Sequence, residues 1–303
     1  MRNRSEHLTL RKQKLRSVAT CNTNAIWTLY VKVINYKGGP EFRSLEGAKW
    51  RVCTDPRSEL VSVAAAEACG TALLVLLSCL PGCAAGAGDA SLVQRALSGG
   101  LVVALIVQCF DHVSGAQLNP TVTLAAVLTQ RISGLRAAVM SASQLAGGIL
   151  GAVVLYLLAS EAVHSCVTKP AIYISLYQAL AIETLLGFCL AMANLGSWDA
   201  RNRHLIDSWP LRIGTVVTAL SLVAGDLTGA SMNPIRSLAP ALVSRDFKTL
   251  WVYCAGPLGG ACAAAALYAS AWRAPPDAPA RGGSPPPAPA PARRLKPSLC
   301  LCS

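Results

Sequence analysis

The sequence predicts an all-α membrane protein in which six transmembrane helices and two re-entrant half-helices form an inverted repeat. Only 14% of the 303 residues are charged and 53% are hydrophobic, whereas a soluble domain carries about 25% charged residues. The apolar residues gather in six blocks, and roughly 20 apolar residues suffice for a helix to cross a bilayer. The phrase Gly-Ala-x-x-Asn-Pro occurs twice, at residues 115–120 and 229–234.

The six apolar blocks are the predicted crossings. They lie at about 60–80, 96–110, 137–159, 172–194, 210–225 and 249–271, and the second and fifth are short or carry polar residues. Gly and Ala recur inside the blocks, as they do where helices pack closely in lipid. The spacings Gly147-x-x-x-Gly151 and Gly256-x-x-x-Gly260 therefore predict helix–helix contacts.

The positive charges predict how the chain is oriented in the membrane. Arg and Lys crowd residues 1–57, the segments around Arg131 and Arg201, and the C-terminal tail, whereas 82–95 and 160–171 hold only Arg95 and Lys169. Under the positive-inside rule both termini lie in the cytoplasm. The net charge of +12 thus orients a multi-pass protein, which we place in the plasma membrane, and does not indicate a nucleic-acid partner.

The core is predicted at 58–272, between a basic cytoplasmic extension at 1–57 and a Pro/Ala-rich, disordered cytoplasmic tail at 273–303. A shift of 114 residues superposes Gly115 on Gly229 and Asn119 on Asn233. The two repeats are predicted at about 58–158 and 172–272. Because each repeat holds three crossings, an odd number, the second must insert upside down relative to the first.

Cysteine and histidine give little sign of a disulfide framework or a catalytic centre. Cysteines inside apolar blocks behave as small hydrophobic residues, and here they are Cys69, Cys79, Cys109, Cys189, Cys254 and Cys262. Cys83 and Cys166 fall in the predicted outer loops, where they either pair or stay free. Four scattered histidines and no clustered carboxylates predict no metal, no cofactor and no enzyme.

The Asn-Pro pairs predict two helix starts. Asn is a favoured N-cap, and Pro is favoured at the first helical position because its missing N–H would be unpaired there. The apolar runs after Asn119-Pro120 and Asn233-Pro234, about 120–129 and 234–244, are too short to span the bilayer. Two such half-helices entering from opposite faces meet near the midplane, N-terminus to N-terminus. Their positive dipole ends repel cations and protons there, while the Asn amides offer donors to a neutral solute.

These repeats resemble the major intrinsic proteins, the aquaporin and glycerol-channel family. The resemblance rests on the paired Asn-Pro boxes, "AEACGTALLVLL" around Glu67, Gln144 in the third block, Glu183 in the fourth and "CAGPLGG" in the sixth. It implies an aquaporin-like homotetramer in the lipid bilayer, with one pore per subunit for small neutral solutes. It also implies that Glu67 and Glu183 are buried structural acids and that His112 lines the cytoplasmic side of the pore.

The resemblance further implies a four-residue selectivity filter, here Gly99 (or its neighbour Ser98), Ser221, Ala230 and Arg236. The water-selective members of the family place Phe and His where this chain has Gly99 and Ser221. Loss of both rings widens the constriction, so we expect glycerol, urea-like solutes and water to permeate. Arg236 keeps hydrogen-bond donors for hydroxyl groups and a charge that repels cations.

Two differences from the glycerol facilitators indicate which members of the family this chain resembles most. Ser237 and Tyr253 stand where those facilitators usually have Asp and Pro. A water-channel backbone with a small filter residue in the fifth crossing is most similar to the insect glycerol-transporting aquaporins, the entomoglyceroporins.

The third residue of each Asn-Pro box, normally Ala, is Thr121 in the first and Ile235 in the second. Ile235 either narrows the pore, which would make a water-selective channel, or packs against neighbouring helices. An alternative of another class is a non-conducting membrane scaffold whose long N-terminus and Pro-rich tail bind partners.

Overall fold

The structure is a computed structural model that describes residues 56–83, 90–202, 204–205 and 208–275. Its long helices are α2 (Pro56–Cys79), α3 (Leu92–Ser114), α5 (Gly134–Leu158), α7 (Leu176–Ser197), α8 (Trp209–Thr228) and α10 (Leu250–Leu267). The shorter helices are α4 (Pro120–Leu128), α6 (Ser160–Ser165) and α9 (Pro234–Ser244). The described residues contain no β-strand, and α10 continues as a π-helix to Trp272.

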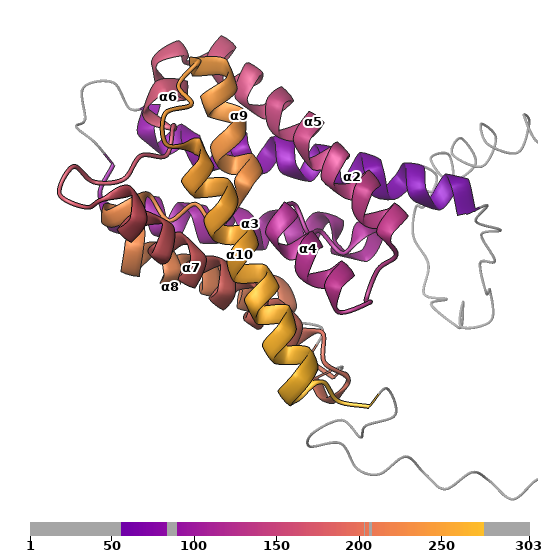
Figure 1. The fold of residues 1–303 in the computed structure, drawn as a ribbon. Helices are drawn as coiled ribbons and strands as arrows, with labels where there is room; N and C mark the ends of the chain where they lie inside the picture. The colour runs from indigo at the N-terminus through magenta and orange to yellow at the C-terminus, as the bar shows by residue number, and fades with distance from the viewer. Residues whose placement is uncertain (1–55, 84–89, 203, 206–207, 276–303) are drawn as a thin grey trace, which may run out of the picture. The chain divides into compact units, whose positions relative to one another are not determined.

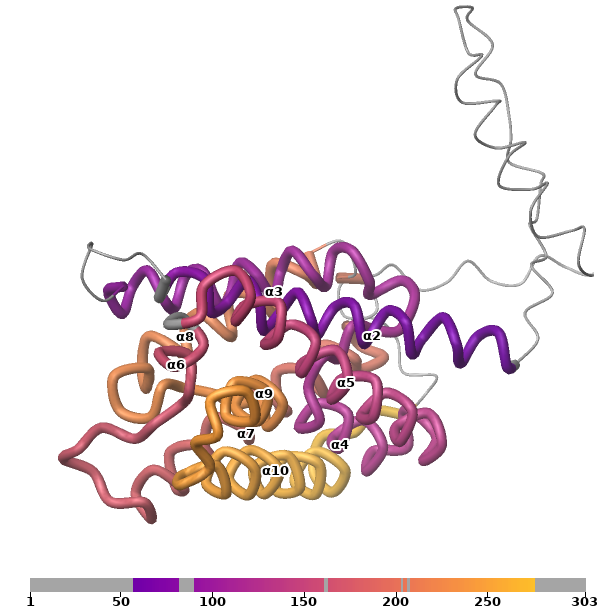
Figure 2. The backbone as a smooth tube through the Cα atoms, turned by 90° about the horizontal axis from the view of Figure 1, so that it is seen from above, coloured from indigo at the N-terminus to yellow at the C-terminus, as the bar shows by residue number. Residues whose placement is uncertain are grey.

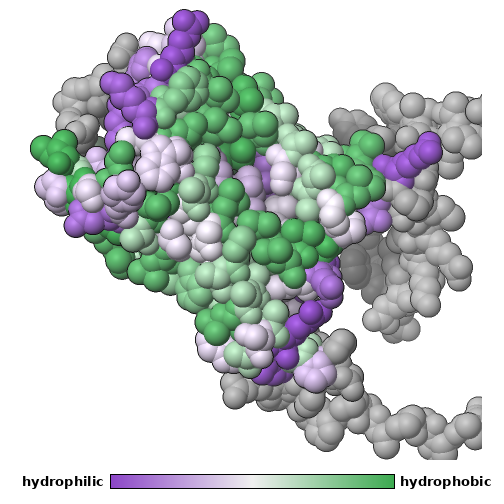
Figure 3. Space-filling view, viewed as in Figure 1, coloured by the Kyte–Doolittle hydropathy of each residue, from purple (hydrophilic) through white to green (hydrophobic). Residues whose placement is uncertain are grey.

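Six helices within the described ranges are long and apolar enough to cross a membrane, so the predicted all-α fold with six crossings is confirmed. Large apolar side chains point outwards from these helices, among them Leu101, Leu105, Leu150, Leu157 and Val223. Figure 3 shows hydrophobic residues over much of the visible face and hydrophilic residues at its upper left and lower right edges. Such a surface suits contact with lipid. The predicted terminal segments lie outside the described residues, apart from 56–57 and 273–275.

Glycines bring the long helices into close pairs. In the first repeat, Cβ atoms added at Gly147 and Gly151 of α5 would clash with backbone atoms of α2. In the second, Cβ atoms at Gly256 and Gly260 of α10 would clash with α7. Both predicted small-residue contacts are therefore confirmed, and α2–α5 corresponds to α7–α10. Gly100 and Gly214 join α3 to α8 in the same way and so connect the two repeats.

The half-helices α4 and α9 lie among the long helices (Figure 1), and Figure 2 views the same arrangement from above. α4 contacts α5, α7 and α10, whereas α9 contacts α5, α6 and α10. At 9 and 11 residues their lengths are about 14 and 17 Å, roughly half the hydrocarbon thickness. Each begins with Pro after an Asn N-cap, as predicted.

The sequence interpretation of Cys79 as a small hydrophobic residue inside an apolar block is wrong, because Cys79 forms a disulfide. Cys166 pairs with Cys79, not with Cys83, and the two Cα atoms lie 5.5 Å apart. Cys79 is the last residue of α2, so it lies at the end of a crossing, and the short helix α6 folds back against this end. Sequence periodicity shows neither that α2 stops at Cys79 nor that α6 exists. The side chain of Cys83 lies outside the described residues, and the other five cysteines of the apolar blocks are free.

Candidate functional site

A cavity of about 540 Å³ brings six of the sequence-predicted site residues together. It is lined by both box asparagines and by all four predicted filter positions: Asn119, Asn233, Gly99, Ser221, Ala230 and Arg236. Ser98, the alternative at the first filter position, is not among the lining residues. α3 and α8 supply Gly99 and Ser221, and the loop before α9 supplies Ala230.

The two asparagines join the loops that precede the half-helices. Oδ1 of Asn119 accepts from the N–H of Thr121 at 2.9 Å, and Oδ1 of Asn233 accepts from the N–H of Ile235 at 3.0 Å. Their Nδ2 atoms donate across to the carbonyls of Met232 and Leu118, at 3.0 and 2.9 Å. Each amide carries two N–H groups, and only one of them has a hydrogen-bond partner among the described residues.

The loop before α4 is held by a buried carboxylate. Glu67 is 0% exposed, and it accepts from the N–H groups of Gln117 and Leu118 at 3.0 and 2.8 Å. It also accepts from Ser114 Oγ at 2.6 Å and from Gln144 Nε2 at 2.8 Å. These bonds fix the N–H groups of the loop on the Glu67 side chain.

The second repeat has the same arrangement. Glu183, also 0% exposed, accepts from the N–H groups of Ser231 and Met232 and from Thr228 Oγ1, at 3.0, 3.0 and 2.7 Å. The first repeat has a hydrogen bond from Gln144 to its buried carboxylate. In the second repeat, the hydroxyl of Tyr253 donates to the Thr228 carbonyl at 2.7 Å and not to Glu183.

Sequence reasoning missed the backbone conformation of these loops. Four residues of these loops have positive φ angles, namely Ala116 at 39°, Leu118 at 54°, Ala230 at 45° and Met232 at 55°. Residues other than Gly rarely adopt this left-handed region of backbone conformation. The four residues form two pairs at matching positions of the repeated phrase. The repeated Gly-Ala-x-x-Asn-Pro phrase was the signal in the sequence that could have pointed to this conformation. A strained backbone conformation that occurs at both copies indicates a shared role.

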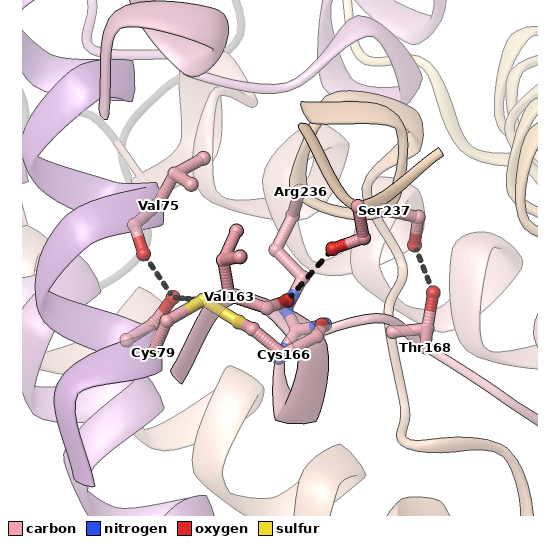
Figure 4. Close-up of a disulfide and its surroundings, with 9 residues drawn as sticks. Val75, Cys79, Val163, Cys166, Thr168, Arg236 and Ser237 are labelled. Carbon is pink, nitrogen blue, oxygen red and sulfur yellow. Dashed lines mark hydrogen bonds between the residues drawn. A yellow bond between two sulfur atoms is a disulfide. The ribbon is translucent and has the colours of Figure 1, made fainter. Parts of the chain in front are cut away.

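Arg236 lies on the first turn of α9, half-buried, at the cavity. Its guanidinium donates through one terminal nitrogen to the carbonyl of Cys166 at 3.1 Å. Figure 4 shows the side chain extending towards Cys166 and the disulfide. The position of the charge therefore depends on the loop between α6 and α7 as well as on α9.

The third residues of the boxes do not face the cavity. Ile235 is 5% exposed, and its Cγ2 occupies the space that a Cβ at Gly148 of α5 would need. Thr121 is 0% exposed, and neither residue is among those that line the cavity. Pro120 and Pro234 occupy the first helical positions.

His112 lines a second cavity of about 840 Å³, on the side that the charge pattern assigns to the cytoplasm. Gln117 and Trp209 line both cavities, so the two adjoin. Trp209 was missed by sequence reasoning, and its Nε1 donates to Asp111 at 3.2 Å. Among the described residues, no group of three or more His, Cys, Asp or Glu side chains could hold a metal ion.

Comparison with known proteins agrees with this geometry. The family model described as Major intrinsic protein matches residues 56–268. Lens fiber major intrinsic protein of Oryctolagus cuniculus is 37% identical over 183 residues, which cover 60% of this chain and 70% of that protein. Aquaporin-4 of Bos taurus is 37% identical over 179 residues, 58% of this chain and 55% of that protein.

The X-ray structure of the aquaglyceroporin from Plasmodium falciparum has the same fold. Its TM-score is 0.64 at 21% sequence identity, and the match covers 70% of this chain and 96% of that one. The family match extends over all the described membrane-spanning helices except the last few residues of α10's π-helical continuation. The chain therefore belongs to the major intrinsic protein family of membrane channels.

Proposed function

We propose that this chain is a passive channel for glycerol, urea-like neutral solutes and water, and that it excludes ions and protons. The observation that carries the proposal is the composition of the cavity at the predicted filter. Arg236 supplies a fixed charge and donors there, and the other three positions are Gly99, Ser221 and Ala230. Small residues at three of four positions leave room for a solute larger than water.

The space at Gly99 supports a wide filter. A Cβ added at this glycine meets no heavy atom within 4 Å. A larger side chain could therefore enter the cavity at this point without displacing the helices. In this chain that volume is left open for the solute.

The lining suits a polyol. Asn119, Asn233 and Arg236 supply donors, and the hydroxyl of Ser221 can accept. Helices α3 and α8 add apolar side chains to the same cavity, namely Val103, Val107, Ile213 and Val217. Glycerol can direct its hydroxyl groups to the polar residues and its carbon chain to the apolar ones, which offsets part of its desolvation.

Ion exclusion follows from charge. The N-termini of α4 and α9 both point to the pair of asparagines, and each helix places about half a positive charge at its N-terminus. Arg236 adds a further positive charge on the same path. Cations and hydrated protons meet repulsion at both places, whereas a neutral solute does not.

Two observations favour this channel over a pore narrowed by Ile235 and over a non-conducting scaffold. Ile235 packs on Gly148, which gives no support to a pore narrowed by this residue. Two adjoining cavities suit a channel better than a scaffold. We extend the proposal to a homotetramer in the plasma membrane with cytoplasmic termini, and to a place beside the insect glycerol-transporting aquaporins.

Swelling of proteoliposomes tests the function, first in a hypotonic shock and then in isosmotic glycerol. We expect the wild type to pass both water and glycerol. A Gly99→Phe, Ser221→His variant should keep water permeation and lose most glycerol permeation, because two rings return to the filter.

Gly259→Phe is the matched control, since a Cβ at this α10 glycine also meets nothing within 4 Å but lies outside the cavity lining. Its glycerol permeation should equal that of the wild type. Swelling of the wild type in the hypotonic shock alone would mean a water-selective channel. No swelling in either condition, with the protein present in the membrane, would favour a scaffold.

A further inference from the structure

The guanidinium of Arg236 is held by a neighbouring loop. Among the described residues, the Cys166 carbonyl is the one hydrogen-bond acceptor that this guanidinium has, at 3.1 Å. Cys166 follows α6, a helix of six residues, and α7 begins only at Leu176. The acceptor that orients Arg236 therefore lies outside the helices, in the segment between α6 and α7.

A covalent bond fixes the residue that supplies this acceptor. The disulfide joins Cys166 to Cys79, the last residue of the long helix α2. The two cysteines are 6% and 4% exposed, and both line the cavity that Arg236 lines. In Figure 4 the disulfide lies beside the Arg236 side chain. The predicted outer position of this loop suits a disulfide, because such bonds persist in oxidising surroundings.

A second tether connects the same segment to α9. Thr168 Oγ1 donates to Ser237 Oγ at 2.8 Å, and Ser237 Oγ lies 2.5 Å from Ser231 Oγ. Thr168 and Ser237 are 7% and 1% exposed. Residues 166–168 thus bridge the end of α2 and the first turn of α9, which carries Arg236.

We propose that the Cys79–Cys166 disulfide is a specificity-determining element of the pore, which holds the Cys166 carbonyl where it orients Arg236. The cysteines are positioning residues, because they act through Arg236. On reduction by a dithiol, the S–S bond accepts two electrons and two protons to give two thiols, and the dithiol closes to its own disulfide. The freed loop no longer fixes the guanidinium, so ion exclusion weakens. This inference rests on the proposed filtering role of Arg236.

The test measures cation leak and water permeability of the full chain in proteoliposomes. A Cys79→Ser, Cys166→Ser variant should leak cations several-fold faster than the wild type, with water permeability little changed. Treatment of the wild type with dithiothreitol should produce the same leak and should not affect the double variant. Cys189→Ser and Cys254→Ser are matched controls, because both thiols are free, half-buried and outside the cavity lining.

An Arg236→Val background separates positioning from general structural support. If the disulfide acts through Arg236, breaking it in this background adds nothing to the leak, whereas independent effects would add. Thr168→Val cuts the second tether alone and should raise the leak by a smaller factor. Should the double cysteine variant fail to fold, reduction of the folded wild type in liposomes still decides the question.

The outcomes distinguish the two proposals. A wild type that excludes cations, together with unchanged exclusion after reduction and in the double variant, overturns the role of the disulfide and leaves the channel function standing. Unchanged exclusion in Arg236→Val overturns the filtering role itself. An additive leak in the combined variant also overturns positioning, since the disulfide would then act elsewhere.

Discussion

Asn119 and Asn233 each donate a hydrogen bond into the loop that carries the other. Asn119 Nδ2 reaches the Met232 carbonyl at 3.0 Å, and Asn233 Nδ2 reaches the Leu118 carbonyl at 2.9 Å. Because Oδ1 of each amide caps its own half-helix, one side chain performs two functions. The N-cap and the cross-link between repeats can therefore be separated by substitution.

Asn119→Asp should keep the N-cap and remove the cross-link. Asp caps helices about as well as Asn, but it has no N–H to offer the Met232 carbonyl. A buried acceptor without its donor costs about 1–3 kcal/mol, so the variant should unfold at a lower temperature in detergent. Its negative charge should also admit cations, measured as conductance in proteoliposomes.

The reciprocal geometry gives the control. Asn233→Asp should lower the unfolding temperature by a similar amount, because it loses the equivalent bond to Leu118. If only one of the two variants is destabilised, the bonds are not equivalent contributors.

Glu67→Gln should destabilise the protein although the two side chains have nearly the same shape. The Glu67 carboxylate accepts from two backbone N–H groups and two side chains. An amide turns one acceptor into a donor that faces other donors, and each buried unsatisfied group costs about 1–3 kcal/mol. The measurement is thermal unfolding of the variant against the wild type in one detergent.

Glu59→Gln is the matched control for this substitution. Glu59 is also on α2 and forms an ion pair with Arg136 at 2.9 Å, but 53% of its side chain is exposed. Exposed pairs contribute at most about 1 kcal/mol, so its unfolding temperature should change little. Equal losses in both variants would contradict a special role of the buried carboxylate.

Gly148→Ala should destabilise the packing of α9 on α5, and Ile235→Ala should restore it. The added methyl group meets Cγ2 of Ile235, and overpacking of this kind costs about 1–3 kcal/mol. The combined variant removes the clash. Unfolding temperatures of the two single variants and the double variant measure the coupling.

Ile235→Ala alone also addresses pore width. Since Ile235 packs on α5 and does not line the cavity, we expect water and glycerol permeation per channel to stay at the wild-type values. Faster permeation would mean that Ile235 restricts the pore, and a water-selective channel would then become the better interpretation.

Local features of this fold could be predicted from sequence, because their causes are local. The starts of α4 and α9 follow from Asn-Pro, since N-capping needs only neighbouring residues. The six crossings follow from apolar composition over the thickness of a bilayer. The contacts of Gly147 and Gly256 follow from small residues one helical turn apart.

Features that depend on distant partners could not be predicted. Ala116 and Leu118 adopt left-handed backbone because Glu67 on another helix binds the N–H groups that this backbone presents. The direction of Ile235 depends on the empty space at Gly148. The partner of Cys166 depends on α6, whose six residues carry too short a pattern to recognise.

The contact between the segment after α7 and the end of α10 should depend on pH. Asp199 is 7% exposed and accepts from Arg201 Nε at 2.7 Å, from another Arg201 nitrogen at 3.0 Å and from the Tyr268 hydroxyl. Hydrogen bonds from Arg201 hold the pKa of Asp199 well below its ordinary value, against the opposing effect of burial, and Tyr268 adds to this lowering.

A lowered pKa in the folded state means that the ionised form stabilises the fold. This contribution is complete above the unfolded-chain pKa of about 3.9 and is lost as the pH falls below it. The unfolding temperature of the wild type should therefore exceed that of Asp199→Asn at neutral pH, and the difference should shrink once the pH falls below about 4.

Asp246→Asn is the control, because Asp246 pairs with Lys169 at 2.9 Å where the lysine side chain is 58% exposed. Solvent screens such a pair, so its variant should show a smaller difference at every pH. If the advantage of Asp199 stayed constant down to about pH 3, its ionisation would not be the source of the stability, and packing of Tyr268 would be.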